Sequence, residues 1–178
     1  MRRNRVDIYS TVFELIDMRS FSNLWFWITL AYVWSAASHY VIGVPYDVVA
    51  RAVKYGGQVE QDLKDLVRVN ASRFVYIADM SGLWLVGFGF FALTAVALMG
   101  FVYGVEFCQA IFLMFSPMAL VFGLSVRCAR RIDHTSLSDI RKKLRRQRLA
   151  VQVIGMLAIV VTAMWGMFHN LSVGVLGG

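Results

Sequence analysis

The sequence predicts an all-α integral membrane protein with four transmembrane helices, an amphipathic segment at its amino-terminal end and amphipathic and basic helical segments in the cytoplasm. Hydrophobic residues make up 58% of the 178 residues, against roughly 45 to 50% in soluble domains. They gather in four long segments, and about 20 apolar residues are enough to cross a bilayer as a helix. Basic residues cluster between these segments, and no linker or repeat divides the chain, so we expect one domain over residues 1–178.

Residues 6–18 form the first patterned segment. Their apolar side chains recur at helical spacing, whereas the acidic side chains fall largely on other positions, and this pattern predicts an amphipathic helix. Such a helix would lie on the membrane surface. An alternative is that it is the first helix of the bundle and packs against its own neighbours.

The first expected span covers residues 22–44. Trp25 and Trp27 lie near one end and Tyr40 near the other, as expected for aromatic belts at the two membrane interfaces. Pro45 would end the helix, because proline has no backbone N–H to donate.

A charged stretch with a helical pattern separates the first two spans. After Gly56 and Gly57, which break regular structure, apolar residues recur at steps of three and four. This spacing predicts an amphipathic helix over residues 58–70. We expect it to run directly into the second span.

The second and third spans are expected at residues 81–103 and 105–126, joined by a tight turn. Two pairs of small residues, each four positions apart, fit the pattern that lets membrane helices approach closely. These pairs are Gly100 with Gly104, and Ala119 with Gly123.

The most basic segment precedes the fourth span. We expect a helix over residues 137–148 that continues into a span at 149–168. Its cations are typical of a contact with anionic lipids, to which each adds about 1 kcal/mol near a negative surface. They are Arg141, Lys142, Lys143, Arg145, Arg146 and Arg148. The alternative is that these cations only keep the loop on the cytoplasmic side of the membrane.

The distribution of positive charge predicts the orientation. The 46–80 and 127–148 loops would share one face and hold fourteen of the eighteen basic residues. By the positive-inside rule that face is cytoplasmic, and we expect a bacterial inner-membrane location. Basic residues near the amino terminus argue for the opposite orientation.

Glu106 is the first candidate for chemistry, because ionisable groups within membrane helices are often functional. With Gln109 and Tyr103 as neighbours, it would line an ion or proton path. The alternative is that Glu106 reaches the headgroup region, where it is a favourable charge at a helix N-terminus.

Histidine is the second candidate. His39 follows a run of small residues, which suits a single-histidine pigment ligand, although a histidine among interfacial aromatics is the ordinary finding. His39 and His169 would lie in opposite leaflets, about 30 Å apart, and therefore cannot share one haem. The two cysteines form no C-x-x-C pair, and we predict no metal, no cofactor and no enzymatic site.

A family resemblance covers about the first fifty residues. The stretches YSTVFELIDMRSFSNLWFW and SHYVIGVPYD resemble a family of small bacterial membrane proteins often labelled as a component of the SufBCD iron–sulfur assembly complex. The resemblance implies no catalytic or binding residue. Because a cluster normally takes about four cysteine or histidine ligands, it implies protein docking through the cytoplasmic loops.

Three functions are compatible with these features. The first is a non-catalytic subunit or scaffold of a homo- or hetero-oligomeric membrane assembly, with membrane lipids and subunits as partners and no nucleic acid. The second is a homo-oligomeric ion channel or transport protein that uses Glu106. The third is a pigment- or cofactor-associated membrane subunit built around His39.

Overall fold

A computed structural model describes residues 21, 23–132 and 137–176 of the chain. Its described part is mostly helical and contains one short β-hairpin. Three helical stretches in it are long and apolar enough to cross a membrane, namely Gly57–Val102, Glu106–Ala129 and Ser138–Leu171. The amphipathic helix expected at 6–18 lies outside the described residues.

The first expected span forms a shorter helix than the sequence suggested. Helix α2 is Leu24–His39, and the Asn23 side chain accepts a hydrogen bond from the Trp25 backbone N–H at 3.0 Å. Strands β1 (Tyr40–Val41) and β2 (Val44–Pro45) then form an antiparallel hairpin. The helix expected over 22–44 therefore ends before its predicted limit, because the turn places Ile42 and Gly43 at positive φ.

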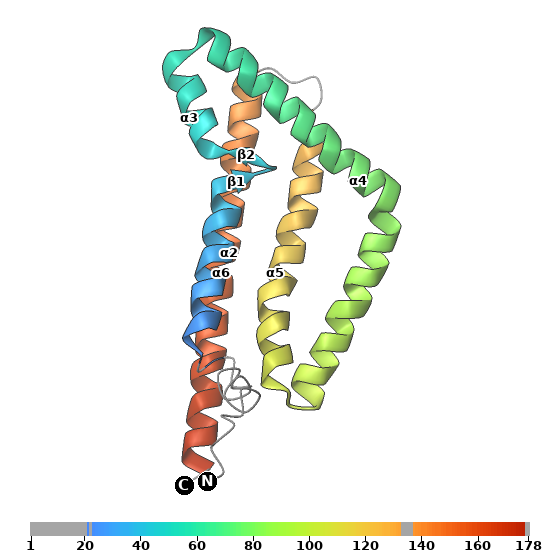
Figure 1. Cartoon of the computed structure of the whole chain (residues 1–178), viewed down its shortest axis with the longest axis vertical. Coiled ribbons are helices and arrows are strands. Elements are labelled where there is room, and N and C mark those ends of the chain that lie inside the picture. Colours follow the sequence, from blue (N-terminus) through green and yellow to red (C-terminus); the bar gives the residue numbers. More distant parts are fainter. Residues whose placement is uncertain (1–20, 22, 133–136, 177–178) are drawn as a thin grey trace, which may run out of the picture.

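Helices α3 (Tyr46–Tyr55) and α4 (Gly57–Ala97) follow the hairpin. Gly56 and Gly57 both have positive φ, a conformation that glycine adopts without the steric cost of a Cβ. Helix α4 contains both the amphipathic segment 58–70 and the start of the second expected span. It crosses the other helices diagonally and then bends to run beside them (Figure 1).

A π-helical turn, η2 (Leu98–Val102), ends this long segment. Gly104, at φ 73°, then reverses the chain into α5 (Glu106–Ala129). The last helix, α6 (Leu137–Leu176), contains both the basic segment and the fourth expected span.

One hydrophobic core lies at the end of the molecule that carries most of the basic residues, the basic end. It joins the hairpin, α3, the first half of α4, the end of α5 and the start of α6. Leu63, Val67 and Leu144 are completely buried in it. The amphipathic segment 58–70 therefore turns its apolar face into the protein's own core.

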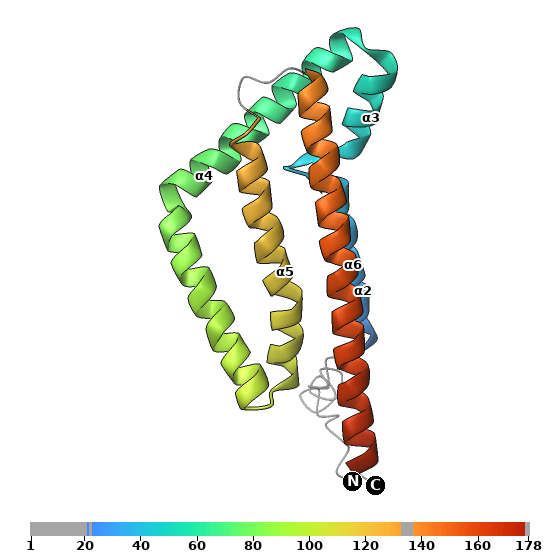
Figure 2. The ribbon, with the colours of Figure 1, turned by 180° about the vertical axis from the view of Figure 1, so that it is seen from behind.

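A second core lies between the long helices. Leu30 and Trp34 of α2 pack with Val121 of α5 and Val151 of α6. Helix α2 runs antiparallel to α6 and lies beside it in both views (Figures 1 and 2).

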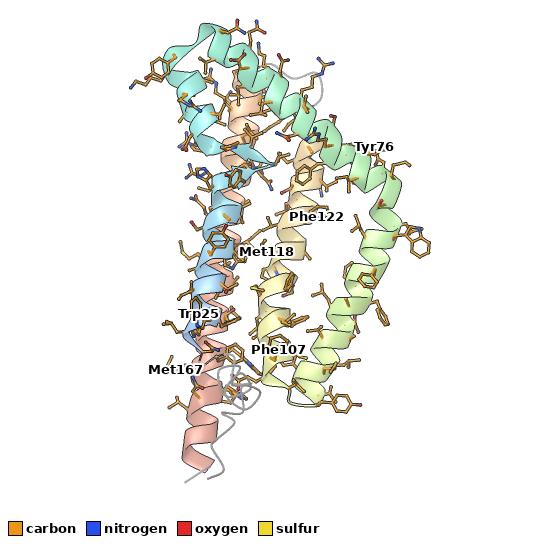
Figure 3. The ribbon with its side chains drawn as sticks, viewed as in Figure 1. Trp25, Tyr76, Phe107, Met118, Phe122 and Met167 are labelled. Carbon is orange, nitrogen blue, oxygen red and sulfur yellow. The ribbon has the colours of Figure 1, made fainter. Side chains whose placement is uncertain are left out.

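The remaining apolar surface points outward. In the most apolar window of the Gly57–Val102 stretch only 6% of residues are buried, and Trp84 and Phe88 are 81% and 73% exposed. Side chains project outward along this part of α4 (Figure 3). Such a contiguous apolar surface is typical of contact with lipid or with another membrane protein.

Candidate functional site

A polar cluster lies where the start of α5 meets the second half of α6. The Glu106 carboxylate accepts a hydrogen bond from the Phe21 backbone N–H at 2.7 Å through Oε1. Its Oε2 lies 3.3 Å from Nε2 of His169. The side chains of Glu106 and His169 are 11% and 26% exposed, so this contact is largely shielded.

Gln109 extends the cluster one helical turn deeper. Its Nε2 donates to the Gly100 carbonyl at 2.8 Å, and its Oε1 accepts from the Trp165 indole N–H at 2.9 Å. A Cβ on Gly100 would come within 2.8 Å of the Gln109 backbone nitrogen. The close approach of η2 to α5 thus requires glycine at position 100.

The cluster contains two groups able to exchange protons, a carboxylate and an imidazole, in contact with each other. Tyr103, the third residue expected near Glu106, is 78% exposed and takes no part in these bonds. In the described part of the chain, no three His, Cys, Asp or Glu side chains gather as metal ligands would.

The cations of the basic helix face several directions. Lys142, Arg145 and Arg146 are exposed, and a cavity of about 360 Å³ between α3 and α6 is lined by residues that include Arg141, Lys142 and Arg145.

Two other cations of this helix contact the protein itself. The Arg148 guanidinium lies 3.9 Å from the centre of the Tyr46 ring, and Lys143 donates a hydrogen bond to the Arg131 carbonyl. Such contacts hold these two side chains toward the protein.

A larger cavity, of about 840 Å³, lies between the first half of α4 and the junction of α5 with α6. Its polar lining carries both signs of charge, and two of the lining residues form an ion pair, with Arg130 Nη2 2.6 Å from Asp79 Oδ1. The lining residues are Gln61, Lys64, Asp65, Arg68, Ala71, Ser72, Val75, Tyr76, Asp79, Met80, Ala129, Arg130, Ile132 and Ile140.

The remaining candidate residues lie apart from these features. Gly104 and Gly123 have open space where a Cβ would stand, and Ala119 is exposed on α5. His39 ends α2, with Nε2 3.8 Å from Asp47 Oδ2. Among the predicted site residues, the structure brings Gln109 into contact with Gly100, and Glu106 precedes Gln109 by three residues on α5.

The sequence did not predict that His169 and Trp165 join Glu106 and Gln109 in this cluster. His169 and Trp165 follow Glu106 by about sixty residues, so sequence distance gave no hint of contact. A weak signal does exist, since the inward positions of α6 recur every three or four residues from Leu144 through Val151 and Thr162, and His169 continues the series.

Comparisons with protein-family models, with curated proteins and with solved structures found no match. The class of the protein therefore rests on the fold itself. It is an all-α protein with three helices compatible with crossing a membrane.

Proposed function

We propose that the protein is a non-catalytic integral membrane subunit or scaffold that carries a folded helical layer on the cytoplasmic side. This cytoplasmic layer consists of the hairpin, α3, the first half of α4, the end of α5 and the start of α6. One observation carries this proposal, namely the contrast between its two ends. Leu63, Val67 and Leu144 are fully buried at the basic end, whereas Trp84 and Phe88 of α4 are mostly exposed. A core of the first kind forms in water, and an apolar surface of the second kind needs lipid or a protein partner.

We further propose that α2 is a fourth membrane crossing. Its 16 residues cover about 24 Å at 1.5 Å per residue, somewhat less than a hydrocarbon core of about 30 Å. It nevertheless packs beside α6 through Leu30, Trp34 and Val151, in the part of α6 that is apolar enough to cross. If α6 crosses, α2 lies at the same depth, and a small mismatch is accommodated by local thinning of the bilayer.

Four crossings place the basic end on one side and the α4–α5 turn on the other. The positive-inside rule makes the basic end cytoplasmic, which fits an inner-membrane protein. Labelling of single cysteines with a membrane-impermeant maleimide tests this arrangement in intact cells. We expect Gly104→Cys to react and Gln58→Cys to react only after the membrane is permeabilised, in a background in which Cys108 and Cys128 are replaced by alanine.

Cross-linking in native membranes, followed by mass spectrometry, tests the role as a subunit. We expect cross-links at fixed stoichiometry from lysines of the cytoplasmic layer, either to a second copy or to one other membrane protein. This docking through the cytoplasmic layer is also what the family resemblance implies. A protein that runs as a monomer and forms no reproducible cross-links would contradict the proposal.

Passage of ions or protons is a second candidate function, because the Glu106 carboxylate lies 3.3 Å from His169 in a largely buried site. Such a pair suits proton transfer, and intramembrane ionisable groups commonly mark ion pathways. Proton flux into liposomes that is lost in Glu106→Gln but kept in Asp47→Asn would support this function. Equal flux in empty and protein-containing liposomes would exclude it.

A further inference from the structure

The 840 Å³ cavity between α4 and the α5–α6 junction has the size of a site for a small molecule. Pockets that hold such ligands measure about 300 to 1,000 Å³. Six of its fourteen lining residues are apolar, and the rest include five charged side chains. A ligand that fits this lining is amphiphilic.

The position of the cavity relates it to the membrane surface. Asp79 and Met80 directly precede the apolar part of α4, and Ala129 and Arg130 stand at the end of α5. These four residues line the cavity. If the apolar helices cross the bilayer, the cavity opens at the level of the lipid headgroups, which occupy the layer just outside the hydrocarbon core.

The charges of the lining indicate the sign of the ligand. Three cations, Lys64, Arg68 and Arg130, face two carboxylates, Asp65 and Asp79, which leaves one positive charge in excess. Arg130 is paired with Asp79 at 2.6 Å. Lys64 and Arg68 stand four residues apart and therefore lie on one face of α4, where they would hold a single negative group.

The hydroxyl of Ser72 adds a polar group beside these cations. It donates its proton to the Val69 carbonyl at 2.9 Å, so its oxygen remains free to accept rather than to donate. Val75, Ala71 and Ile140 supply the apolar wall nearby.

We propose that this cavity binds the headgroup of a membrane phospholipid with one net negative charge, such as phosphatidylglycerol. Lys64 and Arg68 hold the phosphodiester, Asp65 and Ser72 face the polar end of the headgroup, and the acyl chains leave past Met80 into the bilayer. The proposal assigns specific lipid binding to this cavity, in addition to the expected contact of the basic helix. It requires membrane embedding, but it does not depend on the role as a subunit.

The test uses the full chain in nanodiscs that contain equal amounts of phosphatidylglycerol and phosphatidylcholine. Native mass spectrometry measures the fraction of protein that keeps one bound lipid after release from the disc. We expect phosphatidylglycerol to be retained in preference to phosphatidylcholine. The double variant Lys64→Gln/Arg68→Gln should bind it roughly 30-fold more weakly, because each cation contributes on the order of a factor of five near a lipid phosphate.

A matched control removes two other cations. Lys54→Gln/Arg73→Gln changes the net charge equally, and neither residue lines the cavity, so lipid retention should equal that of the unmodified protein. A second variant, Ser72→Phe, places a bulky ring at the cavity wall without changing any charge and should also weaken lipid retention. Because Ser72→Phe removes no charge, loss of the lipid in this variant cannot come from a folding defect caused by charge removal.

Three results would overturn the proposal. The first is equal retention of phosphatidylcholine, and the second is unchanged phosphatidylglycerol retention in both cavity variants. The third is full displacement of the lipid by millimolar glycerol 3-phosphate, which would assign the site to a free phosphate compound from the cytoplasm. None of these results bears on the cross-linking that tests the subunit role.

Discussion

The indole ring of Trp34 lies against Gly155, so that a Cβ on this glycine would stand 2.6 Å from Trp34 Cε3. This contact joins α2 to α6. Within a helix, replacement of glycine by alanine normally gains about 1 kcal/mol. Here we expect Gly155→Ala to destabilise the protein by about 1 to 3 kcal/mol, because a rigid ring must move to make room. Thermal unfolding in detergent, followed by circular dichroism, measures the difference.

Gly123→Ala is the matched control, because a Cβ at this position meets no atom within 4 Å. The same substitution should leave stability unchanged or raise it slightly. If Gly155→Ala proves as stable as Gly123→Ala, α2 does not pack on α6 as described.

Gln109 supports a second prediction. Replacement by leucine removes both the partner of the Gly100 carbonyl and the partner of the Trp165 indole N–H. A buried polar group left without a partner costs about 1 to 3 kcal/mol. We therefore expect Gln109→Leu to lower the free energy of unfolding by about 2 to 5 kcal/mol, measured by thermal unfolding.

Gln58→Leu serves as the comparison for this prediction. The Gln58 amide donates to Asp62 at 3.1 Å on an exposed surface, where water replaces the lost bond. Its effect should stay within about 0.5 kcal/mol. Equal losses in the two variants would mean that the buried bonds of Gln109 add nothing to stability.

The contact between Glu106 and His169 predicts energetic coupling. In a double-mutant cycle of Glu106→Gln and His169→Gln, we expect an interaction energy of about 0.5 to 3 kcal/mol. Glutamine at 106 keeps an oxygen for the Phe21 N–H, so the cycle isolates the bond to the imidazole. The cycle is measured by thermal unfolding of the four proteins at one fixed pH.

A control cycle pairs Glu106→Gln with His39→Gln. His39 lies beside Asp47 at the other end of α2, and its effect should add to that of Glu106 without coupling. Additive effects in the first cycle as well would show that Glu106 and His169 do not interact in the folded protein.

Much of the fold follows from the periodicity of apolar residues. The spacing at 58–70 predicted a helix, and the structure continues it into the next apolar segment as the single helix α4. The limit of α2 could not be predicted in the same way. Residues 40–44 are apolar enough to extend a helix, but the turn at Ile42 and Gly43 packs Val41 and Val44 into the core instead.

The candidate sites were predicted only where one residue type is unusual by itself. An acid at the start of an apolar segment drew attention to Glu106, but its partner His169 is brought near by the packing of α5 against α6. The 840 Å³ cavity was not predicted at all. Its lining comes from three separate segments. Charged residues such as Lys64 and Arg68 are also found on any solvent-exposed helix face, so they gave no signal of a cavity.

The hydrophobic core that contains Leu63 supports the last prediction, which compares two leucines of α4. Leu63 is fully buried, whereas Leu66, one turn further on, is 36% exposed. Leu63→Ala should cost about 2 to 5 kcal/mol through lost burial and an unfilled cavity, and Leu66→Ala should cost less than about 1 kcal/mol. Hydrogen exchange of the 58–70 amides, measured by mass spectrometry in detergent, should then rise sharply for Leu63→Ala alone. If both variants exchange alike, the 58–70 segment lies on the membrane surface with its apolar face in lipid, and the buried layer described above does not form.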